Sequence, residues 1–355
     1  MAKNHPRLFA LGATVAGVTS WYGYKQWATV EAPKIDDSEG LAQSAFELEQ
    51  KRAEEARRDA LEKFFTATQE TASKFIVDLL PTVTTKVKAT CNVDETLRAL
   101  RTPDLTTQQK ISLWQNLKEQ AFAQTIVGVY SMALMIVFLR LQTNLLSKYR
   151  SEEHKVLVRK EYMKRSSYLI DFGINILRND VSRSVASQLS GWKISRKVSA
   201  VDFRAFVERS KEALEDTPTS LFPSYLLPPE NANEEHFFEA DMRGATYTAD
   251  LVAALERQAA DELTLMINET RDFLERPEFE IAVSQCVDYL LEPIIREIDQ
   301  ILPPDTPMTL PKLLPKLDRI YTQVVDTKNE NEHIKKLLSL DVLDKFSHTV
   351  FFDNE

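Results

Sequence analysis

A run of nineteen residues without a charged side chain, at positions 121–139 (AFAQTIVGVYSMALMIVFL), most constrains the fold. A run of this length either crosses a bilayer or forms the central helix of a large core. Gln124, Thr125 and Ser131 make it less apolar, and the polar helix before it begins near Gln108. A core built from 355 residues needs one element that is apolar on nearly every side. The sequence therefore favours a buried helix over a membrane span.

The remaining sequence is patterned for helices. No segment alternates convincingly between apolar and polar residues, as a half-buried strand would. A first long helix is expected from about Ser38 to near Leu80, ending at Pro81 because proline and the residue before it disfavour helix continuation. Further helices are expected near residues 82–91, 94–102, 107–148, 154–190, 200–215, 248–275, 279–301, 310–325 and 331–350. The predicted fold is all-α, a single elongated helical bundle with an N-terminal transmembrane anchor.

The anchor is expected at residues 8–24 (LFALGATVAGVTSWYGY), seventeen positions without a formal charge. Trp21 and Tyr24 lie at its far end, where aromatic residues gather at a membrane interface. A cleaved signal peptide or a mitochondrial presequence could also carry such a run. An uncleaved anchor is favoured because it explains both the apolar run and the aromatic end. The expected organisation is an anchor over residues 1–30, a linker over 31–40 and a cytosolic bundle over 41–355, with a proline-rich acidic loop at 217–245.

Nothing in the sequence points to an enzyme or to a bound cofactor. The chain has only 8 glycines, and neither a phosphate-binding loop nor a G-x-S-x-G turn is present. The five histidines are scattered, and no CxxC pair indicates a metal site. A net charge of −9 argues against nucleic-acid binding. Cys91 and Cys286 are expected to be reduced, buried thiols, as in a body that faces the cytosol.

Two segments carry a resemblance to a known family. In the first, residues 110–149, the motifs W-x-x-L-K, V-Y-S and L-R-x-Q-x-N begin at Trp114, Val129 and Leu139. In the second, residues 265–279, the sequence is LMINETRDFLERPEF. Together these segments resemble the peroxin-3 family, whose members anchor in the peroxisomal membrane and dock the cytosolic receptor and chaperone peroxin-19.

The resemblance implies a single-pass protein of the peroxisomal membrane whose body faces the cytosol. It implies that peroxin-19, carrying newly made membrane proteins, docks through an amphipathic helix near its own amino terminus. It implies no small-molecule substrate and no nucleic acid. Carried over by motif, the residues that bind peroxin-19 are Trp114, Leu117, Lys118, Lys110, Leu100 and Arg101.

The spacing of the residues around Trp114 gives independent support for a binding site. Lys110, Trp114 and Leu117 follow one another at i, i+4 and i+7, so they share a face of one helix. Continuing this stripe leads to the least apolar positions of the next segment, Gln124, Gly128 and Ser131. We therefore expect the stripe to point away from the core, and an exposed tryptophan on it to be a binding anchor. The competing interpretation is a core tryptophan.

An alternative function is a helical scaffold anchored in the mitochondrial outer membrane. The weakly basic segment before the apolar run, with only Lys3 and Arg7 as formal cations, is compatible with that location. The identity of the bound partner would separate the two hypotheses.

Overall fold

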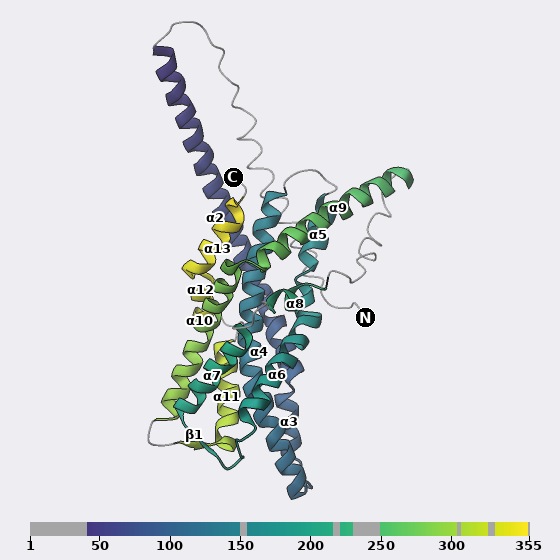
Figure 1. Cartoon of the computed structure of the whole chain (residues 1–355), viewed down its shortest axis with the longest axis vertical. Coiled ribbons are helices and arrows are strands. Elements are labelled where there is room, and N and C mark those ends of the chain that lie inside the picture. The colour runs from purple at the N-terminus through teal and green to yellow at the C-terminus, as the bar shows by residue number, and fades with distance from the viewer. Residues whose placement is uncertain are drawn as a thin grey trace.

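The computed structural model of the chain describes residues 41–149, 155–215, 221–229, 249–303, 307–325 and 331–353, and side chains are described in these ranges except at 41–47, 155–157 and 249–257. The described residues form an elongated bundle of helices (Figure 1), which confirms the predicted fold class. The anchor and linker expected over residues 1–40 lie outside the described residues, as does most of the loop expected at 217–245.

A long central helix, α4 (Thr107–Lys148), organises the bundle. Every residue from Ala121 to Leu146 is buried. Among the described helices, α4 is the one long and apolar enough to cross a membrane, and its most apolar 18-residue window is 100% buried inside the protein. The prediction of a buried helix at residues 121–139 is therefore confirmed, because other helices surround α4 on all sides.

The first helix is longer than the sequence predicts. Helix α2 (Leu41–Cys91) continues through Pro81, so the predicted end at Leu80 is wrong. Proline removes one backbone donor, which should leave the carbonyl of Val77 without its helical partner. Val77 is 40% exposed, so water can reach this turn. Leu80 and Val83 on either side of Pro81 are fully buried, and their packing keeps the helix continuous.

Two other predicted helices are interrupted. Residues 154–190 divide into α5 (Lys155–Lys164), the π-helical turn η1 (Leu169–Gly173) and α6 (Ile174–Leu189). A Cβ at Gly173 would lie 1.9 Å from the carbonyl oxygen of Tyr225, so glycine allows a neighbouring segment to approach. Residues 331–350 divide into α12 (Glu332–Leu338) and α13 (Asp341–Phe352), because the backbone of Leu340 is extended.

The other helices follow the predicted pattern closely. They are α3 (Val93–Leu100), α7 (Ala200–Glu215), α9 (Ala249–Leu274), α10 (Pro277–Ile301) and α11 (Leu310–Val324). Three short elements were not predicted. They are α8 (Phe222–Leu226) and the antiparallel strands β1 (Lys197–Val198) and β2 (Met308–Thr309), in which Lys197 pairs with Thr309.

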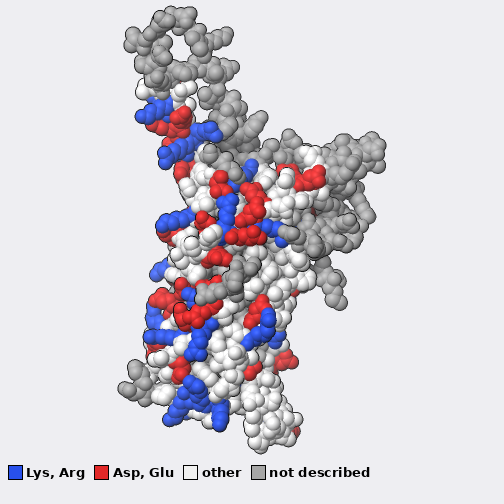
Figure 2. Space-filling model, viewed as in Figure 1, with Lys and Arg blue, Asp and Glu red and all other residues white. Residues whose placement is uncertain are grey.

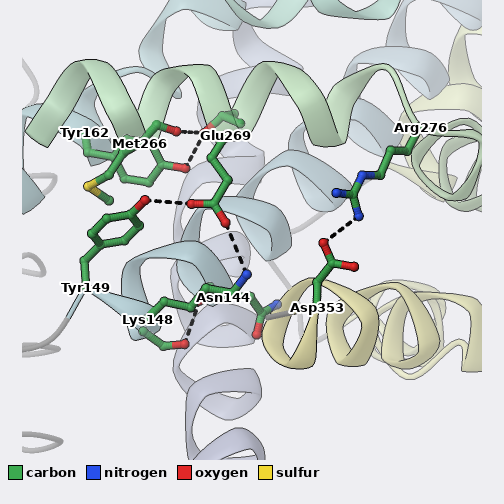
Figure 3. A network of polar contacts seen from close by, with 10 residues as sticks. Asn144, Lys148, Tyr149, Tyr162, Met266, Glu269, Arg276 and Asp353 are labelled. Atoms are coloured by element: carbon green, nitrogen blue, oxygen red, sulfur yellow. Dashed lines mark hydrogen bonds and ion pairs between the residues drawn. The ribbon is translucent and has the colours of Figure 1, made fainter. Parts of the chain in front are cut away.

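Polar contacts attach α9 to the end of α4 (Figure 3). The carboxylate of Glu269 accepts hydrogen bonds from the Lys148 ammonium at 3.2 Å and from the Tyr149 hydroxyl at 2.7 Å. The hydroxyls of Tyr162 on α5 and Thr270 on α9 are 2.7 Å apart. These contacts join α5, α9 and the last turn of α4 at one end of the bundle.

Gly128 supplies a specific test of the packing between α4 and α11. A Cβ at Gly128 would lie 2.0 Å from the Tyr321 hydroxyl oxygen, and the buried ring of Tyr321 has no room to retreat. We expect Gly128→Ala to lower the free energy of unfolding by about 1–3 kcal/mol, as overpacking of a core does. Gly191 is the matched control, since nothing lies within 4 Å of its Cβ position and its φ is not positive. Urea denaturation of both variants measures the difference, and equal stabilities would contradict the packing.

Candidate partner-binding surface

The end of the bundle formed by α3 and the start of α4 carries the predicted binding residues. Helix α3 ends at Leu100, and a short turn leads into α4. Thr106 and Gln109 form a capping box at the start of α4. The Thr106 hydroxyl accepts a hydrogen bond from the backbone N–H of Gln109, and the side-chain oxygen of Gln109 accepts one from the backbone N–H of Thr106. On the face that Figure 2 shows, few charged side chains lie at this end of the molecule. The capping box fixes where α4 begins and therefore which way its first turns face.

Trp114 lies half-buried in the second turn of α4, packed against the edge of the core. Ile111, three residues before it, is 44% exposed. Leu100 on α3 is also half-buried and packs against the same core. Both side chains therefore keep part of their apolar surface in solvent. A tryptophan that is neither fully buried nor fully exposed is the kind of residue that supplies binding energy when a partner covers it.

Leu117 and Lys118 have a different environment from Trp114. Leu117 is fully buried, so it belongs to the core beneath the surface. Lys118 is 4% exposed, and its ammonium donates to the carbonyl oxygens of Leu189 at 2.9 Å and Trp192 at 3.2 Å. Burial lowers the pKa of Lys118. In this geometry Lys118 joins α4 to the C-terminal end of α6 through hydrogen bonds, and its charge does not face solvent.

Arg101 and Lys110 are both exposed and lie on either side of the turn between α3 and α4. Neither takes part in an ion pair with any other residue that the structure describes. Their charges are therefore available to acidic groups on a partner. The predicted set thus divides into two exposed cations, two half-buried apolar residues and two buried supporting residues.

One step of the sequence argument for Trp114 is wrong. Gln124, Gly128 and Ser131 do not point away from the core, since all three are buried. The Gln124 amide donates to the Asp318 carboxylate of α11 at 2.7 Å, and Gly128 receives the ring of Tyr321. Gln124 and Gly128 thus allow α11 to lie close to α4.

Ile111 was missed by the sequence reasoning. It lies three residues before Trp114, so the two side chains are neighbours on one face of α4. An isoleucine in an otherwise polar first turn was the available signal.

Other chemistry is not indicated in the described part of the chain. Among the described residues, no group of three or more His, Cys, Asp or Glu side chains is placed to hold a metal ion. Cys91 and Cys286 are free and buried as expected, and burial raises the pKa of each thiol to about 12. Thiols with so high a pKa remain protonated and unreactive at neutral pH.

Comparison with known proteins identifies the family. The Peroxin-3 family profile matches residues 148–353, more than half of the chain. The chain belongs to the Peroxin-3 family. Among its relatives, peroxisomal biogenesis factor 3 of Bos taurus is 22% identical over 310 residues, and that of Mus musculus is 23% identical over 310 residues; both alignments cover 81% of this chain and 74% of the relative. Peroxisome biogenesis protein 3-1 of Arabidopsis thaliana is 20% identical over 252 residues, covering 65% of each chain. Membership of this Peroxin-3 family supports a role in peroxisome biogenesis.

The contacts of Lys118 generate a stability prediction. We expect Lys118→Met to lower the free energy of unfolding by about 1–3 kcal/mol, because two partly enclosed carbonyl groups lose a charged donor while the apolar stem is kept. Lys110→Met is the matched control, since Lys110 is exposed eight residues earlier on the same helix, and its effect should stay within about 0.5 kcal/mol. Chemical denaturation compares the two variants. An equal effect at both positions would remove the structural role assigned to Lys118.

Proposed function

We propose that this Peroxin-3 protein is the peroxisomal membrane docking receptor for peroxin-19 and its membrane-protein cargo. The observation that carries the proposal is the half-buried Trp114 beside the exposed Ile111, at the free end of the bundle. An amphipathic helix binds by placing apolar residues from successive turns into such a surface. The role requires no catalytic group, so the protein is proposed to be a non-enzymatic biogenesis factor.

The proposed docking surface consists of Trp114, Ile111 and Leu100 as apolar contacts, with Arg101 and Lys110 as flanking cations. Leu117 and Lys118 support it from within. The apolar residues would supply most of the affinity, since binding energy concentrates in a few large side chains. The cations would mainly raise the association rate with an acidic partner. The profile match begins at residue 148, so the assignment of these residues relies on the W-x-x-L-K motif and on their exposure.

The proposed location is the peroxisomal membrane, with residues 8–24 as the single span and the bundle in the cytosol. The apolar run at residues 8–24 and the complete burial of the other apolar run, at 121–139, support this topology. The similarity to peroxisomal biogenesis factors favours the peroxisome over the mitochondrial scaffold considered above.

Substitution of Trp114 tests the docking role. We expect Trp114→Ala to weaken peroxin-19 binding by about 2 kcal/mol or more, roughly thirtyfold in Kd, because a large anchor is lost. The protein should remain folded, since Trp114 lies at the edge of the core and its removal leaves no enclosed cavity. Phe172→Ala is the matched control, an aromatic residue that is 59% exposed on η1, and it should leave Kd unchanged. Isothermal calorimetry measures binding, and thermal melting measures stability. A large loss of stability, with unchanged affinity per folded molecule, would reassign Trp114 to the core.

Protease accessibility tests the topology. Protease added to intact peroxisomes should digest the chain from residue 41 onward, because the bundle is proposed to lie in the cytosol. A protein enclosed in the peroxisomal lumen serves as the control for intact membranes. Protection of the bundle under conditions that also protect the lumenal protein would contradict the proposed orientation.

A further inference from the structure

The first part of α2 extends away from the rest of the bundle (Figure 1). Residues 48–59 are exposed without interruption. These twelve residues make more than three helical turns, and a helix that packed on the bundle would bury part of every turn. In the part of α2 whose side chains are described, the first aromatic contacts with another helix are made by Phe64 and Phe65, whose rings lie 5.7 and 5.3 Å from that of Phe351 on α13. The packed part of α2 therefore begins near Phe64.

The sequence of this segment explains why it is helical although residues 48–59 are exposed. Residues 41–63 (LAQSAFELEQKRAEEARRDALEK) contain neither glycine nor proline and are rich in Ala, Glu, Lys and Arg. Glu54 and Arg58, and Asp59 and Lys63, are spaced at i,i+4 with the acid first, the more favourable order. Each such pair adds about 0.2–0.5 kcal/mol to an isolated helix. The free-energy cost of forming a first helical turn does not arise here, because the helix extends from the packed part of α2.

The same features make the segment stiff. Sharp kinks arise at proline, at glycine or serine pairs or at π-bulges, and residues 48–63 contain none of these. In Figure 2 basic and acidic side chains alternate along the described part of this helix, which suits an exposed surface. At about 1.5 Å per residue, residues 41–63 span roughly 35 Å.

We propose that residues 41–63 are a rigid helical spacer that holds the bundle about 35 Å away from its point of attachment. The rigidity stands on the exposure of residues 48–59 and on the composition of residues 41–63. Its use rests on the proposed function, in which the point of attachment is the membrane and the docking surface lies at the opposite end of the bundle. The spacer then leaves room between bilayer and bundle for a membrane-protein cargo, while α2 holds the docking surface far from the bilayer.

Spin-label distances in the full chain, reconstituted in nanodiscs, test the rigidity. Labels are placed by Glu49→Cys and Lys74→Cys, both exposed on α2, while the native thiols Cys91 and Cys286 are buried. A continuous helix predicts a narrow distance distribution near roughly 38 Å, from 25 residues at 1.5 Å each. A variant with residues 50–61 replaced by Gly-Ser repeats should give a broad distribution. An equally broad distribution in the unreplaced chain would overturn the rigid spacer.

Insertion of a peroxisomal membrane protein into organelles tests the use of the spacer. Deletion of residues 46–63 removes eighteen residues, or five full turns, so it shortens the spacer by about 27 Å and keeps the helix phase. We expect at least a twofold loss of insertion with unchanged affinity for peroxin-19. Replacement of residues 46–63 by an unrelated Glu-Ala-Lys helix of equal length should restore insertion. If the replacement variant also fails to restore insertion, residues 46–63 act as a binding site and the spacer is refuted. If the deletion variant supports normal insertion, the length of the segment has no function. Failure of the unaltered chain to bind peroxin-19 would instead refute the proposed docking role.

Discussion

The burial of α4 on every side is the constraint on which the rest of the structure depends. From Ala121 to Leu146 no residue of this helix is exposed. A helix that is apolar around its whole circumference must be surrounded by other elements, and each neighbouring helix can cover only one side of it. Helices α2, α6, α10, α11 and α13 therefore line up along α4, and the length of α4 sets the elongated form of the bundle (Figure 1).

The polar groups inside this core fix the positions of the surrounding helices. Arg140 is 2% exposed, and its guanidinium donates to the Ser73 hydroxyl of α2 at 3.0 Å and to the Leu338 carbonyl of α12 at 2.9 Å. A buried charge without partners would cost several kcal/mol. Sliding α2 or α12 along α4 would remove these partners, so Arg140 selects one register among many similar apolar contacts. Gln124 and Asp318 act similarly between α4 and α11.

Local sequence determined some of this structure and long-range packing determined the rest. The bounds of α4 were predictable because Thr106 and Gln109 cap its start and an apolar run follows. The passage of α2 through Pro81 was not, because it depends on packing of Leu80 and Val83 against distant helices. The W-x-x-L-K motif at Trp114 was visible in the sequence, whereas the internal role of Lys118 depends on carbonyl groups more than 70 residues away. The burial of Gln124 was not predictable for a similar reason, since its partner Asp318 lies on α11, far along the sequence.

The internal contacts of Lys118 also explain how one short helix segment can be firmly held while the side chain of Trp114 stays partly exposed. The Lys118 ammonium holds α4 to the carbonyl end of α6, and Leu117 fills the core on the adjacent face. These two neighbours fix the orientation of the helix, so Trp114, one turn earlier, is held in position although only part of its surface is packed. A side chain fixed in this way loses little conformational entropy when a partner covers it. Under the proposed docking role, the buried members of the motif would contribute to binding through the rigidity they give to the exposed ones.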